Sequence, residues 1–233
     1  MSTARPAIYS LLQAILALVA VYLPTFLITS LLIAYGVFGK LSKPQAQLVS
    51  IPIIIIVSLG IALAIMAWLV WRRGQNFADY GLRSVSWRRL ITAAVLGLLF
   101  GSALYGLHRL LPLGASPDLG ELSRWQVVLF FWIGAPIQEE TIFRGLIQTV
   151  AGTRYAKQLQ IGRLKLPVSA LISAALFALV HTATLSLGAS PGDALFIVGG
   201  ALLLGLVAGW LRAWTGSLVP GMVVHALFNI ILG

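Results

Sequence analysis

Charged residues are scarce in this chain of 233 residues: they make up 9%, whereas hydrophobic residues make up 59%. A soluble domain carries roughly 25% charged residues, which cover its surface with hydrated groups. Six acidic and sixteen basic side chains are too few to cover a protein of this length. The composition therefore excludes a soluble globular protein and predicts that most of the surface faces lipid.

Cysteine is absent, which excludes disulfides, thiolate metal ligands and a cysteine nucleophile. The chain also lacks a Gly-x-Ser-x-Gly turn, a His-Glu-x-x-His pair and a phosphate-binding glycine-rich loop. The net charge of +10 does not indicate a nucleic-acid partner, because the basic residues cluster in short gaps between apolar runs. The expected surroundings are the lipid bilayer and other membrane components.

Seven apolar stretches are long enough to cross a bilayer as helices, which satisfy their backbone polar groups internally. The sequence thus predicts an all-α, polytopic membrane protein that forms a single membrane domain over residues 1–233. Pro24 and Pro136 are predicted kink points in the first and fourth spans. The spans are expected at about 8–38, 46–71, 90–112, 123–150, 166–187, 193–211 and 217–232.

The basic residues predict the orientation, because cytoplasmic loops are rich in Lys and Arg. One face would hold eleven: Arg5, Arg72, Arg73, Arg83, Arg88, Arg89, Arg154, Lys157, Arg163, Lys165 and Arg212. The other face would hold four: Lys40, Lys43, Arg109 and Arg124. We therefore expect a cytoplasmic N-terminus. A chain of this size with short loops is expected in a bacterial plasma (inner) membrane. The segment 74–89 is expected either along the inner leaflet or as a solvated loop.

Two glutamates and one arginine lie inside the fourth span, where each charge costs about 2.5–3.5 kcal/mol on insertion scales. Glu140 and Arg144 are four residues apart, so they share a helix face and are predicted to form an ion pair. Glu139 points about 100° away and has no such cation on its own helix. It is therefore the candidate for proton transfer.

Polar side chains also occur inside two later spans. His181 lies in the fifth span, and His225 and Asn229 lie one turn apart in the seventh. Counted from the span ends, these three residues and Glu139 fall within a band about 10 Å thick. We therefore expect them to converge on one water-filled cavity, open to the cytoplasm or sideways to lipid.

This set of side chains is suited to hydrolysis of a peptide bond. Glu139 and His181 are predicted to activate water, and His225 and Asn229 to stabilise the oxyanion. Glu139, His181 and His225 are also a possible zinc ligand set, so the sequence leaves the cofactor open between none and zinc.

Two other functions remain open from the sequence. A non-proteolytic scaffold or assembly factor would use the small-residue face of the sixth span, which packing within the chain explains equally well. That face consists of Gly199, Gly200, Gly205 and Gly209. A proton-coupled transporter would use the same Glu and His residues, although the chain lacks internal repeats. His108 and Arg109 are expected to reach the headgroups and have no predicted chemistry.

Three motifs resemble those of the CPBP family (CAAX protease and bacteriocin-processing, or Abi) of intramembrane proteases. They are Glu139-Glu140-x-x-x-Arg144, Phe177-x-x-x-His181 and His225-x-x-x-Asn229. The resemblance implies an endopeptidase acting on membrane-associated proteins, for which both metal-dependent and glutamate-activated water mechanisms are considered. It implies that Glu139 is catalytic, that His181, His225 and Asn229 act or bind in the site, and that Glu140, Arg144 and Phe177 support it. It covers residues 123–232, the expected catalytic core, and leaves 1–122 as variable N-terminal helices.

Overall fold

The structure is a computed structural model that describes residues 4–114, 116, 122–153, 155–162 and 164–232. Within these residues the chain forms seven long helical stretches and one short hairpin, which confirms the predicted all-α membrane fold. The first three stretches are α1 (Ala4–Ala34), α2 (Lys43–Arg73) and α3 (Trp87–Leu110). The fourth is an unbroken series of α4 (Arg124–Val127), η2 (Val128–Gly134), α5 (Ala135–Glu140), η3 (Thr141–Ile147) and α6 (Gln148–Gly152). The last three are α7 (Val168–Val180), which continues into η4 (His181–Leu187), then α8 (Pro191–Thr215) and α9 (Val219–Leu232).

Five of these helices are long and apolar enough to cross a membrane: Pro6–Ala34, Leu48–Arg73, Trp87–Leu110, Val168–Leu187 and Pro191–Thr215. The chain is therefore a multi-pass integral membrane protein. The fourth stretch, which carries the three charges, is not among the five. The 14 residues of α9 make it a shorter apolar helix, about 21 Å long at 1.5 Å per residue.

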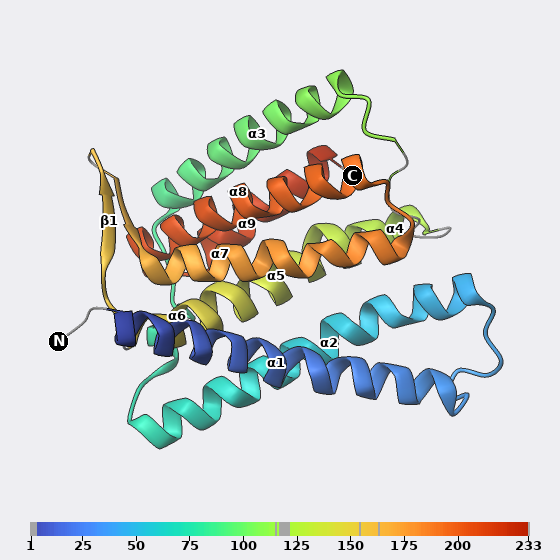
Figure 1. Ribbon diagram of the computed structural model, residues 1–233, viewed down its shortest axis with the longest axis horizontal. Coiled ribbons are helices and arrows are strands. Elements are labelled where there is room, and N and C mark those ends of the chain that lie inside the picture. The colour runs from blue at the N-terminus through green and yellow to red at the C-terminus, as the bar shows by residue number, and fades with distance from the viewer. Residues whose placement is uncertain (1–3, 115, 117–121, 154, 163, 233) are drawn as a thin grey trace.

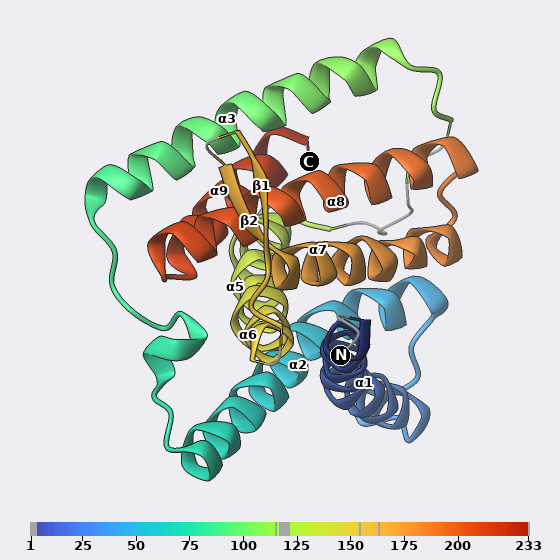
Figure 2. The same cartoon turned by 60° about the vertical axis from the view of Figure 1, so that its left-hand side comes forward.

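The fourth stretch lies in the middle of the molecule. In both views α1 and α2 pack on one side of it, and α3, α8 and α9 lie on the other (Figures 1 and 2). The N-terminus and the hairpin lie at one end of the helices, and the C-terminus lies at the opposite end (Figure 1).

The basic end of the molecule is more ordered than the sequence predicts. Strands β1 (Gln158–Ile161) and β2 (Leu164–Pro167) pair as an antiparallel hairpin, where a plain loop and the start of a span were expected. The segment 74–89 contains η1 (Phe77–Tyr80), and Tyr80 is buried. Arg212 donates from Nη2 to the carbonyl of Asp79 at 2.8 Å, so the segment is attached to α8 rather than free in solvent. Arg154 and Arg163, and the side chains of Arg5 and Lys43, lie outside the described part of the chain.

Glycines of α8 allow it to pack closely on α7. A Cβ at Gly205 or Gly209 would lie 2.9 Å from the Cβ of Ala174 or Ala170. The larger part of the small-residue face therefore serves packing within the chain, which was one of the two explanations left open. Gly199 differs, because a Cβ there would have no neighbour within 4 Å among the described atoms.

Candidate active site

The fourth stretch departs from α-helical geometry on both sides of the two glutamates. The flanking segments η2 and η3 are π-helical, and the six residues of α5 lie between them. A π-helical turn bonds each residue to the fifth rather than the fourth along the chain, and such turns are frequent at functional sites. Glu139 and Glu140, the last two residues of α5, therefore lie between two π-helical segments, whose turns are wider than those of an α-helix.

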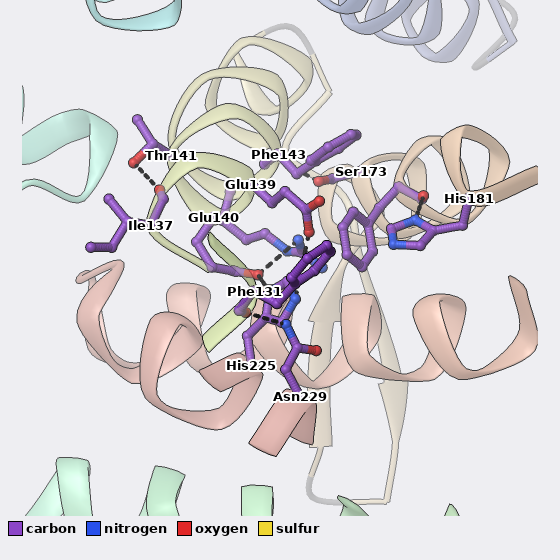
Figure 3. Close-up of polar contacts among 12 residues, drawn as sticks. Phe131, Ile137, Glu139, Glu140, Thr141, Phe143, Ser173, His181, His225 and Asn229 are labelled. Carbon is purple, nitrogen blue, oxygen red and sulfur yellow. Dashed lines mark hydrogen bonds and ion pairs between the residues drawn. The ribbon is translucent and has the colours of Figure 1, made fainter. Parts of the chain in front are cut away.

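Pro136 frees a backbone acceptor that positions Asn229. The carbonyl of Phe131 lacks its α-helical donor, because the N–H of Ala135 bonds to Phe130 instead. The next possible donor is residue 136, and proline has no N–H. Asn229 of α9 donates from Nδ2 to this carbonyl at 2.8 Å (Figure 3). One N–H of the Asn229 amide group remains for another acceptor.

Glu140 is fully buried and connects two helices. Its Oε1 accepts a hydrogen bond from Nη1 of Arg144 at 3.0 Å, which confirms the predicted ion pair. The same oxygen lies 3.1 Å from Nδ1 of His225 on α9 (Figure 3). A carboxylate can only accept hydrogen bonds, so this contact places a proton on Nδ1 of His225. Glu140 thereby fixes the orientation of the imidazole.

Helix α9 approaches Glu140 closely because residue 221 is a glycine. A Cβ at Gly221 would lie 2.7 Å from Oε2 of Glu140. That oxygen is buried, and the described residues offer it no hydrogen-bond partner. The close approach of the helix is what brings His225, one turn later, to the carboxylate.

We expect Gly221→Ala to displace the Glu140 carboxylate and to weaken its contact with His225. The overpacked variant should lose about 1–3 kcal/mol of stability. Thermal unfolding in detergent measures this loss. Gly199→Ala in α8 is the matched control, and it should be neutral or slightly stabilising because alanine is the better helix former. Equal stability of Gly221→Ala and the parent protein would contradict the proposed close contact.

Glu139 faces a different direction from its neighbour, as the helical spacing predicts. Its side chain is 21% exposed, and its Oε2 lies 3.5 Å from Nε2 of His225. His225 therefore lies between two carboxylates, with Glu140 on its buried side and Glu139 on its open side (Figure 3).

His181 is held by the helix that carries it. Its Nδ1 lies 2.8 Å from the carbonyl of Phe177, one turn earlier. Since a carbonyl only accepts, Nδ1 carries a proton, and Nε2 of the neutral ring is a hydrogen-bond acceptor. The ring of Phe177 packs edge-to-face on both histidines, with centroids 4.5 Å from His181 and 5.8 Å from His225. Cζ of Arg144 lies 4.5 Å from the centroid of the same ring.

The predicted catalytic residues all line one cavity of about 700 Å³. Its walls include Glu139, His181, His225 and Asn229, together with Phe177. Glu140 and Arg144 are buried outside this lining. Figure 3 shows His181 set apart from the group formed by Glu139, Glu140 and His225. The structure thus places the four residues on one cavity.

The described side chains do not form a metal site. Among them, no group of three His, Asp or Glu residues lies close enough together to hold a metal ion. The zinc ligand set that the sequence left open, Glu139, His181 and His225, is therefore not assembled.

Two polar contacts near the site were missed from the sequence. Nε2 of His108 lies 3.0 Å from Oδ1 of Asp193, which is 1% exposed, so His108 pairs with α8 instead of reaching the headgroups. Both residues line the cavity. The sequence contained a signal for this pair: His108 lies near the end of the predicted third span and Asp193 begins the sixth, so both were expected at the same membrane face. Gln138 donates to Oγ of Ser58 at 2.9 Å, which connects α5 to α2.

Comparison with known proteins identifies the second half of the chain. Residues 121–231 match the family described as Rce1-like, type II CAAX prenyl endopeptidase Rce1-like. No curated protein and no solved structure matched the chain. The matched segment contains all seven residues of the three motifs. Residues 121–231 are therefore a domain of the Rce1-like type II CAAX prenyl endopeptidase (CPBP/Abi) family, a family of proteases that act on proteins.

Proposed function

We propose that this protein is an intramembrane endopeptidase that hydrolyses peptide bonds of membrane-embedded or membrane-associated proteins. The observation that carries the proposal is the convergence of Glu139, His181, His225 and Asn229 on one cavity within a protease-family domain. Polar groups at membrane depth are tolerated where they line a cavity that is enclosed by protein and reached by water, and this cavity provides such a place.

Glu139 and His181 are the proposed water-activating pair. We assign them one water molecule of the cavity that both line; it donates one hydrogen bond to the Glu139 carboxylate and one to Nε2 of His181. As the water oxygen bonds to the substrate carbonyl carbon, Glu139 takes its proton and the carbonyl electron pair moves to oxygen. When the C–N bond breaks, the departing nitrogen receives that proton, so the charges balance.

His225 and Asn229 are the proposed oxyanion donors. Nδ1 of His225 is directed to Glu140, so Nε2 is the ring nitrogen left to face Glu139 and the cavity. The Asn229 amide is anchored by one N–H and can offer the other. Fixed donors of this kind stabilise the negative charge that develops on the carbonyl oxygen.

Glu140, Arg144 and Phe177 are proposed to support these groups. Glu140 and Arg144 fix the imidazole of His225 from behind the cavity wall. Phe177 packs against both imidazoles and holds His181 through its backbone carbonyl. From the charge distribution we further propose that the N-terminus lies in the cytoplasm, and from the chain's size and short loops that the membrane is a bacterial plasma membrane.

The test is cleavage of a library of transmembrane peptides by the purified protein in lipid vesicles. The parent protein should cleave members of the library, and His181→Gln should lower the rate by about 10²–10⁴-fold, the range expected for loss of one member of the pair that activates water. Thr182→Ala changes the next, exposed residue and serves as the control. Peptide hydrolysis by His181→Gln at the parental rate would refute the assigned role.

A further inference from the structure

Three arginines surround the C-terminal end of α8, toward the end of the molecule that carries the hairpin (Figure 1). Arg212 belongs to the last turn of α8. Arg89 reaches the same turn from α3 and donates from Nη1 to the carbonyl of Thr215 at 3.3 Å. Arg83 lies beside the residue that ends the helix, because a Cβ at Gly216 would be 3.4 Å from its Nη1. We call the three side chains the arginine cluster.

The protein neutralises only part of the charge of this cluster. Among the described residues, no carboxylate lies within 4.0 Å of a nitrogen atom of the three arginines. Asp79, the one acidic residue described at this end of the molecule, acts on Arg212 from beyond that distance. Its carboxylate accepts a hydrogen bond from the N–H of Asn76. Three positive charges thus face one negative charge, and a negative group from outside the chain would stabilise them.

Most N–H groups of the cluster have no acceptor among the described residues. A guanidinium group offers five N–H donors in a planar fork, which matches the oxygens of a phosphate. The described residues accept one hydrogen bond from Arg212, one from Arg89 and none from the guanidinium group of Arg83, which is exposed. Two bonds to backbone carbonyls anchor the surrounding chain, and the remaining donors are available to a ligand.

An apolar surface lies directly beside the cluster. Cζ of Arg89 lies 5.4 Å from the centroid of the Trp214 ring, which stacks on Trp210 with centroids 5.4 Å apart. Helical spacing places Leu203, Trp210 and Trp214 on one face of α8. Leu203 and Trp214 are both 45% exposed, and α8 is long and apolar enough to cross a membrane. This face is therefore suited to contact with lipid hydrocarbon.

We propose that the arginine cluster binds the phosphate group of an anionic phospholipid, whose acyl chains lie along the Leu203–Trp214 face of α8. Basic pockets between membrane helices bind lipid headgroups in this way. A free phosphate ion would satisfy the N–H groups but would leave the adjoining apolar face without a partner, so the lipid fits both features. The proposal goes beyond peptide hydrolysis and does not depend on it.

The test is lipid binding by the full chain in a non-ionic detergent, followed by native mass spectrometry. The protein is titrated with dioleoylphosphatidylglycerol, which is anionic, or with dioleoylphosphatidylcholine, which has the same chains and no net charge. Arg83→Gln with Arg89→Gln removes two charges of the cluster and leaves Arg212, which anchors the chain to Asp79, in place. Arg72→Gln is the matched control, because it makes the same change at an exposed arginine of the basic end outside the cluster.

The parent protein should bind the anionic lipid at least about tenfold more tightly than the zwitterionic one. The double variant should lose at least about tenfold in affinity for the anionic lipid, since each arginine contributes roughly fivefold. Arg72→Gln should bind as the parent does. Thermal unfolding without added lipid shows whether each variant is folded. Arg83→Gln alone breaks no described hydrogen bond of its side chain and should lose about fivefold, so the test stands even if the double variant is unstable.

Equal affinity of the parent protein for the two lipids would overturn the proposal. So would unchanged affinity of the folded double variant and of Arg83→Gln, or an equal loss in Arg72→Gln, which would indicate a diffuse field of charge. Displacement of the lipid by inorganic phosphate at a similar concentration would assign the cluster to a free anion instead. Because binding requires no cleavage, a failed protease assay would refute the proposed function and leave this result intact.

Discussion

Replacing Glu139 with glutamine should lower the rate of peptide hydrolysis by about 10²–10⁴-fold, the range expected for loss of a general base. Glutamine has nearly the same shape, but its amide cannot take a proton from water. The partly exposed side chain makes one described ion pair, with His225, so the fold should survive. Cleavage of a transmembrane peptide and thermal unfolding, measured on the same preparation, separate the two effects.

Asp79→Asn is the matched control, because it makes the same carboxylate-to-amide change at the basic end. Asp79 accepts a hydrogen bond from the N–H of Asn76 there and takes no part in the cavity lining. The Asp79→Asn variant should cleave the peptide at the same rate as the parent protein. Cleavage by Glu139→Gln at more than half the parental rate would remove the assigned mechanism. Rescue of a deletion phenotype by an inactive Glu139→Gln protein would show that the cell uses the protein as a scaffold.

Local contacts of the site could be predicted from the sequence, whereas contacts between helices could not. The Glu140–Arg144 ion pair follows from a spacing of four residues, which brings side chains together on any helix. The contact between Glu140 and His225 depends on how closely α9 approaches α5. Hydropathy does not encode this approach, and the close contact at Gly221 is visible only once both helices are placed.

The backbone also has features that the hydropathy pattern predicts and features that depend on how the helices pack. Long apolar runs predict helices because a membrane-spanning backbone must bond to itself. The hydropathy pattern does not indicate the shift from α-helical to π-helical bonding around α5, because η2 and η3 are apolar at most positions and show no period that would distinguish the two geometries. Pro136 was expected to kink the helix; its missing N–H also leaves the Phe131 carbonyl available to Asn229. The β1–β2 hairpin lay in a segment whose charges pointed to a loop.

Replacing Arg144 with methionine should cause the largest loss of stability, about 3–5 kcal/mol, because it leaves a buried carboxylate without its cation. Both partners of the ion pair are fully buried, so water cannot replace the lost interaction. Methionine also forfeits the contact between the guanidinium group and the Phe177 ring. Unfolding by a denaturing detergent, titrated into the folded protein, measures the change in free energy.

The double variant Glu140→Leu with Arg144→Met distinguishes an unpaired charge from simple loss of packing. Removing both charges eliminates the unpaired carboxylate, and buried ion pairs replaced by apolar residues of similar volume often retain stability. We therefore expect the double variant to recover most of the stability that Arg144→Met loses, a coupling of about 0.5–3 kcal/mol. It should stay inactive, because Nδ1 of His225 then lacks the acceptor that orients its ring. A double variant as unstable as the single one would show that Arg144 acts through its volume, and an active one would show that Glu140 does not position His225.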